Sequence, residues 1–202
     1  MKNLIIILVI LVSLSFVACE QKKEPRLEKR VPRITIKGLT EDANFFVEDQ
    51  INHLETLAQE EIIIKSIKAS NEKNKGLTTD EINRLDCEWQ QNNSKDNPFI
   101  KKFITNECAD LLIKLQRQRP QFLEIFVMDN RGLIVGESNI TSDYLQADEA
   151  KWSAVFGKNT IWHGELKYDK SSAAHGVQVS VPVKDIGAIC ATVGLKNRHT
   201  VR

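Results

Sequence analysis

The apolar positions in the first half of the chain recur every three or four residues. The stripe that they form is made of Val47, Ile51, Leu54, Ala58 and Ile62. This spacing predicts one long helix over residues 41–70. Thr78, with Glu81 three residues later, forms a capping-box pattern ahead of further apolar positions. A second, shorter helix is therefore predicted to begin there.

A third helix is predicted after a polar loop. Pro98 suits its first turn, because a missing N–H costs nothing there. The inward positions that the helical period gives are Phe99, Phe103, Leu111 and Leu115. The helix must end before Pro120, which disfavours helical backbone in the residue before it.

After Pro120 the apolar pattern takes the shorter period of strands. The runs "FLEIFVMD" and "LIVGES" are joined by "NRG", and the glycine can adopt the positive φ of a tight turn, so they predict a hairpin. A helix around residues 148–156 precedes three more strand-like runs, "TIWHGELKY", "GVQVSVPV" and "GAICATVGL". A long helix and a helical hairpin packed on a five-stranded antiparallel sheet make an α+β domain.

The N-terminus has the pattern of an export signal. An apolar core of fourteen residues, Leu4 to Val17, lies between Lys2 and Ala18, and it is shorter than the roughly 20 residues of a membrane-spanning helix. The stretch "SFVAC" resembles the lipobox of bacterial lipoproteins, which implies lipidation of Cys19. An uncleaved N-terminal anchor and a soluble exported form are the alternatives.

These features divide the chain into a signal peptide (1–18), a lipidated N-terminus and linker (19–39), and one domain (40–202). Removal of Lys2 with the signal leaves 27 basic and 27 acidic residues. This balance does not favour a nucleic-acid partner, which would need a basic face. About 160 residues after the linker suit a single domain with its own core.

Three cysteines remain once Cys19 is assigned to a lipid. Cys87 and Cys108 lie on successive predicted helices and could form a disulfide across the helical hairpin. The alternative is that both are small buried thiols. Cys190 lies in the apolar run "GAICATVGL" and is expected in the core.

The second half of the chain resembles the extracytoplasmic Cache domains of bacteria, a PAS-like sensor fold also called PDC. The likeness rests on "FLEIFVMDNRGLIVGESNITSDYLQADEAKW", on "YD" and on "VSVPVKDIGAICATVGL", and it extends back through "NKGLTTDEINRLDCEW". It implies a long N-terminal helix behind a central sheet, with a small-molecule pocket between the other side of the sheet and "TSDYLQADEAKW", which would act as a lid.

The resemblance also suggests which residues contact a ligand. Trp152 matches a lid-helix tryptophan of amino-acid sensors, and Asp169 after Tyr168 matches their later acidic contact. The arginine that those sensors carry two residues before the tryptophan is Ala150 here, so amino-acid binding does not carry over. The candidate ligand-binding residues are Asp143, Tyr144, Lys151, Trp152, Tyr168 and Asp169.

A cationic amine is an alternative ligand. Asp143, Asp148 and Asp169 would hold its charge, and Trp152 and Tyr168 would supply aromatic faces for cation–π contacts. Each residue also has a structural alternative: core packing for the tryptophan, capping or turn formation for the aspartates and Tyr168, and a solvated side chain for Lys151.

The motifs do not favour an enzyme. The four histidines show no paired metal-binding spacing, and neither a Gly-flanked nucleophilic serine nor a phosphate-cradling glycine loop is present in the sequence. The lid acids lack the alternation of an EF-hand calcium loop. We therefore expect no catalytic residues, no cofactor and no metal.

The sequence favours a membrane-tethered extracytoplasmic module that senses a small polar molecule. We expect neither a second membrane span nor a cytoplasmic domain after the last strand-like run, so the signal is expected to pass by contact to a signalling or transport partner protein. The alternative is a structural or interaction lipoprotein whose Cache scaffold is inert.

Overall fold

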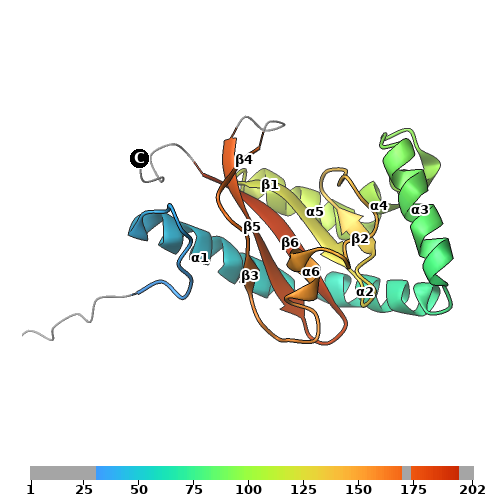
Figure 1. Ribbon diagram of the computed structural model, residues 1–202, viewed down its shortest axis with the longest axis horizontal. Helices are drawn as coiled ribbons and strands as arrows, with labels where there is room; N and C mark the ends of the chain where they lie inside the picture. The colour runs from blue at the N-terminus through green and yellow to red at the C-terminus, as the bar shows by residue number, and fades with distance from the viewer. Residues whose placement is uncertain (1–30, 170–173, 196–202) are drawn as a thin grey trace, which may run out of the picture. The chain divides into compact units, whose positions relative to one another are not determined.

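The computed structural model describes residues 31–169 and 174–195 of the 202-residue chain (Figure 1). The predicted signal peptide and Cys19 lie outside the described residues. The helices and strands belong to one compact unit that begins at Pro32. Among the residues described, no helix combines the length and the apolar character needed to cross a membrane.

The centre of the fold is an antiparallel sheet, which confirms the α+β prediction. The strands are β1 (Phe122–Met128), β2 (Ile134–Glu137), β3 (Trp162–His163), β4 (Lys167–Asp169), β5 (Ala174–Val183) and β6 (Gly187–Leu195). Their order is β2-β1-β6-β5-β3, with β4 also paired to β5. The sheet has six strands instead of the five predicted, because the run "TIWHGELKY" is interrupted between His163 and Lys167.

The predicted hairpin of β1 and β2 is confirmed. Gly132 in its turn has a φ of 73°, a value that favours glycine. A Cβ there would lie 2.7 Å from Ala147, so the turn also needs glycine for space. The turn is therefore fixed both by its backbone conformation and by the loop that packs on it.

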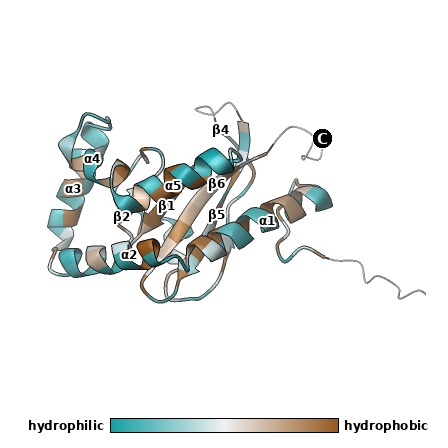
Figure 2. Cartoon of the chain, turned by 180° about the vertical axis from the view of Figure 1, so that it is seen from behind, coloured by the Kyte–Doolittle hydropathy of each residue, from teal (hydrophilic) through white to brown (hydrophobic). Residues whose placement is uncertain are grey.

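Helices α1 (Glu41–Leu57), α2 (Glu61–Asn74) and α5 (Glu107–Gln118) cover one face of the sheet, which we call the back face (Figure 2). β-branched side chains dominate the part of the sheet that they cover. From β5 these are Val177, Val179, Val181 and Val183, and from β6 they include Ile189 and Val193. Alternation along each strand brings all of these side chains to the same face.

The single long helix predicted over residues 41–70 is wrong. Helix α1 ends at Leu57, and α2 begins at Glu61 after a turn in which the Glu60 N–H donates to the Leu57 carbonyl. The break changes the buried side of the helix, so that Ile63 is buried whereas Ile62 is 39% exposed. Neither proline nor glycine occupies the break, so local sequence did not signal it.

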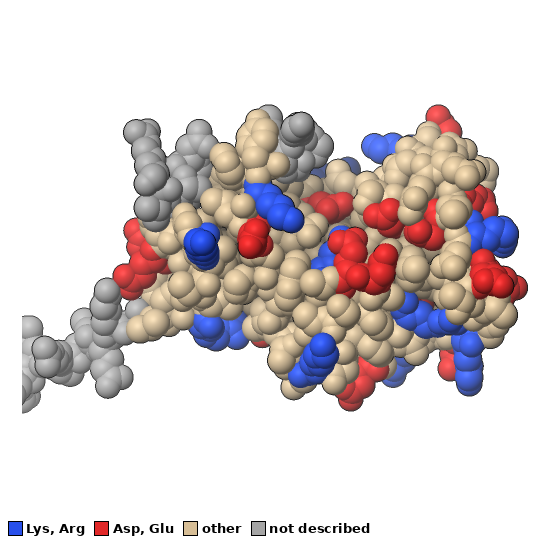
Figure 3. Space-filling model, in the orientation of Figure 1, with Lys and Arg blue, Asp and Glu red and all other residues tan. Residues whose placement is uncertain are grey.

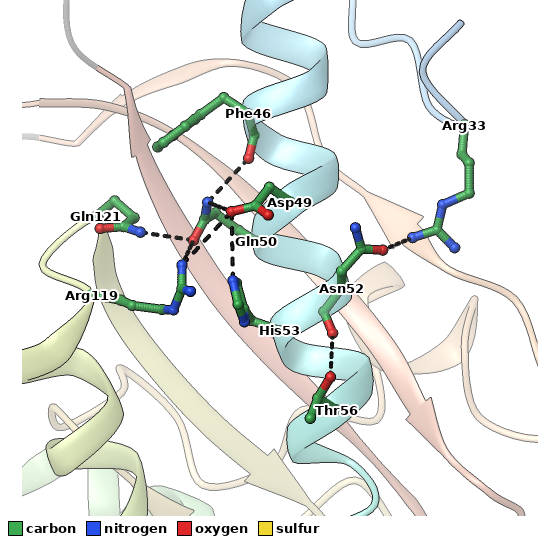
Figure 4. A network of polar contacts seen from close by, with 9 residues as sticks. All are labelled: Arg33, Phe46, Asp49, Gln50, Asn52, His53, Thr56, Arg119 and Gln121. Atoms are coloured by element: carbon green, nitrogen blue, oxygen red, sulfur yellow. Dashed lines mark hydrogen bonds and ion pairs between the residues drawn. The ribbon is translucent and has the colours of Figure 1, made fainter. Parts of the chain in front are cut away.

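A polar network fastens α1 to the turn between α5 and β1 (Figure 4). The Gln50 side chain is almost fully buried, and its carbonyl oxygen accepts a hydrogen bond of 2.9 Å from Gln121. Arg119 pairs with Asp49 at 3.7 Å. At the start of the chain, Arg33 bonds Asn52 at 2.6 Å and Glu55 at 3.1 Å. Side-chain contacts therefore fix the position of α1 and of Arg33 in the segment before it.

Helix α3 (Thr79–Gln91) begins as predicted, because Thr78 and Glu81 form a complete capping box. The predicted third helix is divided into α4 (Pro98–Ile104) and α5, with Asn106 as the N-cap of α5. Pro98 lies in the first turn of α4, and α5 ends at Gln118, before Pro120. Both of these boundary predictions are confirmed.

The structure does not contain the Cys87–Cys108 disulfide. Cys87 is exposed on α3, whereas Cys108 is buried on α5 and lies where a Cβ on Gly136 of β2 would meet it at 2.8 Å. The pairing fails because Cys108 faces the sheet and not α3. Cys190 is a buried free thiol, as expected.

Candidate functional site

The front face of the sheet, opposite α1, α2 and α5, carries polar side chains at its centre. The register pairs Glu124 of β1 with Thr192 of β6, and Thr192 with Gln178 of β5. These three side chains therefore form one row across the sheet. The neighbouring row is Glu137, Phe126, Cys190, Ser180 and Trp162. We call the first row the polar floor.

A cavity of about 900 Å³ lies over the polar floor. Its walls come from residues 162–168 of the β3–β4 region, residues 35–37 ahead of α1, and Ser142. The volume is within the range of about 300 to 1,000 Å³ that small-molecule sites occupy. Chain segments distant in sequence thus form one concave, open space with both polar and apolar walls.

Two aromatic side chains line the wall of this cavity. The Trp162 ring lies against Gly164, where an added Cβ would be 3.2 Å from the indole. Tyr168 is 55% exposed and meets the His175 ring edge-on at a centroid distance of 5.1 Å. The wall also carries charges of both signs, from Lys37, Lys167 and Glu165. The cavity therefore offers aromatic, cationic and anionic contacts to a small polar molecule.

The segment "TSDYLQADEAKW", residues 141–152, lies on the same side of the sheet as the cavity, and we call it the lid segment. Its first half is held by α3. The Asp86 carboxylate accepts the backbone N–H groups of Tyr144 and Leu145, both at 2.9 Å. The Trp89 indole N–H donates to the Thr141 carbonyl at 2.9 Å. Protein contacts alone therefore order this half of the lid segment.

Tyr144 and Asp143 take structural positions. Tyr144 is 3% exposed and packs in an aromatic cluster, stacked on Trp89 at 5.6 Å between ring centroids. Burial raises the pKa of its phenol above the usual range. The Asp143 carboxylate accepts the Ser142 hydroxyl, and its backbone carbonyl accepts the Gln146 amide at 2.7 Å. Neither side chain lines the cavity.

Lys151 and Trp152 both pack on the front face of the sheet, and the Trp152 indole N–H donates to the Asp129 carbonyl at 3.2 Å. Lys151 is 7% exposed; its amine lies 2.8 Å from Glu149 and 5.5 Å from the centre of the Phe126 ring, on the front face. The Trp152 ring stacks on the Phe156 ring, with 4.8 Å between the ring centroids. The helix here, α6 (Ala150–Ser153), spans four residues, so its helical period alone could not fix which side chain would face the sheet.

The remaining candidate residues are Asp148, Tyr168 and Asp169. Asp148 is exposed in the lid segment. Among the predicted ligand contacts whose side chains the structure describes, Tyr168 is the one that lines the cavity. Asp169 ends β4 and pairs with Ala174 in register, and its side chain lies outside the described part of the structure. The structure therefore brings the lid candidates and Tyr168 to one side of the sheet without grouping them in one site.

Among the carboxyl groups of the front face, Glu137 has the pKa that departs most from its ordinary value. It is fully buried, and one of its oxygens accepts the Thr141 N–H at 3.0 Å. Its other oxygen has no hydrogen-bond partner among the described residues. Burial, assisted by the charge of Glu124, raises its pKa to about 8. Glu137 is therefore largely protonated at neutral pH.

The described residues offer little for metal binding, and two of their three free thiols are buried. No group of three or more metal-ligating side chains occurs in the ranges 31–169 and 174–195. Burial raises the pKa of the Cys108 and Cys190 thiols to about 12, so both stay protonated and unreactive at neutral pH.

The polar floor was missed in the sequence because each of its residues stands alone in an apolar strand. A signal was present: Gln178 and Ser180 alternate with valines along β5, which indicates one polar and one apolar face. Strand register then brings Gln178 beside Thr192. The alternation could have revealed a polar face, but not which side chains are neighbours.

No family model and no curated protein matches the chain. Among solved structures, the chain is similar to the sensor domain of the histidine kinase DctB from Vibrio cholerae, with 11% identity and a TM-score of 0.45, over 77% of this chain and 53% of that one. It is also similar to the ligand-binding domain of the chemoreceptor Tlp3 from Campylobacter jejuni in complex with L-valine, with 12% identity and a TM-score of 0.36, over 75% and 62% of the two chains.

A further similar structure is the ligand-binding domain of the amino-acid chemoreceptor PctC from Pseudomonas aeruginosa in complex with GABA. The identity is 11% and the TM-score 0.34, over 74% of this chain and 62% of that one. The chain thus spans between about half and three fifths of the length of these three structures.

Proposed function

We propose that this protein is a membrane-tethered extracytoplasmic module that binds a small polar molecule in the cavity over the polar floor. The observation that carries the proposal is the cavity itself, about 900 Å³ in volume and lined by Glu124, Gln178 and Thr192 together with Trp162 and Tyr168. Concave spaces of this size that combine aromatic walls with a few convergent polar groups are typical of small-molecule sites.

The resemblance to Cache sensors implies a pocket between the side of the sheet opposite the N-terminal helix and the lid segment. The cavity lies on that side, but only Ser142 of the lid segment lines it. Helix α1 packs on the back face, and the cavity lies on the front. Binding there would draw together the β3–β4 region and residues 35–37, which connect directly to α1. A ligand could in this way bias the N-terminal part of the domain, and the signal would pass by contact to a partner protein.

The tether belongs to the same proposal. The lipobox-like stretch at Cys19 supports a lipid anchor on the extracytoplasmic side of a bacterial membrane. Intact-mass analysis of protein extracted from membranes tests this part. A mass that includes residues 1–18, or unchanged processing of Cys19→Ser, would exclude the lipid anchor without affecting the proposed cavity.

Ligand binding is tested by thermal unfolding of the full-length protein against a panel of amino acids, amines, carboxylates and purines. A ligand present at one hundred times its dissociation constant stabilises the fold by about 2.7 kcal/mol. For a domain of this size that raises the melting midpoint by roughly 5 to 10 °C. Gln178→Leu should abolish the rise, because it removes a polar group from the floor.

Gln118→Leu is the matched control, since Gln118 is exposed on α5 and lies on the other side of the sheet. It should keep the full ligand response. If no compound shifts the melting midpoint, and native mass spectrometry finds no co-purified molecule, the second candidate is favoured. This is an inert structural or interaction lipoprotein, for which the protein contacts that already order the lid segment are the specific support.

A further inference from the structure

A second surface, away from the polar floor, combines an excess of basic side chains with an apolar interior. It is a groove between α2 and the α3–α4 region, formed by two hollows of about 370 and 470 Å³ that share Lys73 and Lys102. Lys65 lies at one end and Arg84 at the other. We call this surface the basic groove.

The basic charges on the rim have few partners. Arg84 pairs with Glu88 at 3.6 Å. No carboxylate lies within ion-pairing distance of Lys65, Lys73 or Lys102 within the part of the chain that the structure describes. In Figure 3, basic side chains lie at the lower right edge of the molecule, where α2 runs in Figure 1, with acidic side chains among them. Such a rim attracts negative charge.

The interior of the groove is apolar. Its lining includes Ala69, Leu77, Leu85, Phe99, Phe103 and Val135. Two of the polar groups that also line it are engaged: the Ser70 hydroxyl donates to Asp129 at 3.0 Å, and the Asn106 amide donates to the Val135 carbonyl at 2.9 Å. The Lys102 amine lies 5.9 Å from the centre of the Phe99 ring. Glu88 and Glu107 also line the groove, so four basic side chains face two acidic ones and the rim keeps an excess of positive charge, while the floor favours hydrophobic contacts.

Helix α2 presents the same combination along one side. Ile62, Ala69 and Lys73 follow one another at spacings of seven and four residues, which places them on a common stripe. Ile62 is 39% exposed, one of three large hydrophobic side chains that are exposed in the described residues. Ile62 therefore adds an exposed apolar side chain to the groove, near the N-terminal end of α2.

We propose that the basic groove binds an acidic segment of a second protein, with carboxylates at the lysine rim and apolar side chains on the floor. A concave groove between helices suits an inserted chain segment, whereas a flat layer of anionic lipid headgroups would reach only the rim. Complementary charge gives such contacts their rate and specificity. The inference is independent of the cavity, since the two sites share no residue.

The test measures binding of the full-length protein, in detergent, to a short fluorescein-labelled peptide of alternating glutamate and leucine, by fluorescence anisotropy. We expect saturable binding that Lys73→Glu with Lys102→Glu weakens at least about tenfold. The matched control, Lys114→Glu with Lys158→Glu, makes the same change in net charge at exposed lysines outside the groove, and should leave binding unchanged.

Several outcomes would overturn the proposal. Absence of peptide binding, or an equal loss in both double variants, would mean that the groove recognises no acidic segment. Equal binding of a peptide with serine in place of leucine would remove the role of the apolar floor. Binding to phosphatidylglycerol vesicles that depends on Lys73 and Lys102, without peptide binding, would assign the surface to the membrane instead.

Discussion

The two faces of the sheet are built from the same strands but covered in different ways. On the back face, Val177, Val179 and Val181 are fully buried in the apolar cluster that they share with the helices. On the front face, the alternate residues of the same strand are Gly176, Gln178 and Ser180. The front face also holds two buried oxygens that lack hydrogen-bond partners among the described residues. They are one carboxylate oxygen of Glu137 and the hydroxyl oxygen of Ser180.

This difference suggests that the back face mainly stabilises the fold and that the front face mainly serves binding. Buried polar atoms without partners are costly, so a face that keeps them has not been optimised for packing alone. Polar groups of the back-face helices are satisfied instead, as Gln50 shows by bonding to Gln121 and to the Phe46 carbonyl (Figure 4). We therefore expect mutations on the back face to change stability, and mutations on the front face to change binding or pH response.

The largest expected effect is on the back face. Ile51→Ala removes a fully buried side chain of α1 from the main core, and it should lower the free energy of unfolding by about 2 to 5 kcal/mol. Urea denaturation followed by circular dichroism measures the change. Ile51→Val should cost only about 0.5 to 1.5 kcal/mol. An Ile51→Ala loss below that of Ile51→Val would show that α1 contributes little to the core.

The second effect is a pH dependence that comes from Glu137 on the front face. Its pKa is about 8 in the folded protein, against 4.5 as the ordinary value. The folded state therefore binds more protons than the unfolded state between these pH values, and stability must fall as pH rises. Between pH 6 and pH 8 the loss from this group should be about 2 kcal/mol.

Denaturation midpoints at pH 6, 7 and 8 measure this dependence. Glu137→Gln should make the profile flatter by that amount, because the amide has the same shape and does not titrate. The Glu124 charge acts on Glu137, so Glu124→Gln should lower the pKa of Glu137 slightly and shift the fall to lower pH. A profile that is the same in the wild type and in Glu137→Gln would contradict the raised pKa.

The third effect tests the contacts that order the lid segment. Asp86→Ala removes the acceptor of the Tyr144 and Leu145 amides, and should cost about 1 to 2 kcal/mol, since hydrogen bonds to a charged group are stronger than neutral ones. Hydrogen exchange should accelerate at these two amides and not at the β5 amides. Unchanged exchange at both would show that the lid segment is held by other contacts.

The smallest expected effect on stability is at the polar floor. Thr192→Val keeps the shape of a half-buried side chain and should change the free energy of unfolding by no more than about 0.5 kcal/mol. The same variant should weaken any ligand-dependent rise in melting temperature. Loss of stability comparable to that of Ile51→Ala, with ligand response intact, would reverse the assignment of the two faces.

Features that depend on neighbours in the chain were determined by the sequence. The capping box of Thr78 and Glu81, the hairpin turn at Gly132 and the helix start at Pro98 are all present where they were predicted. Each of them is fixed by hydrogen bonds or backbone angles within a few residues. The alternation of valine along β5 likewise marks its buried face without reference to any other strand.

Features that depend on distant segments were decided only by the tertiary structure. The turn after Leu57 has no local signal, and it lets Ile63 replace Ile62 at the sheet. On the four-residue α6, Lys151 lies over the Phe126 ring while Trp152 stacks on Phe156. The polar floor joins β1, β5 and β6 through strand register, which arises from long-range pairing and cannot be read along one strand.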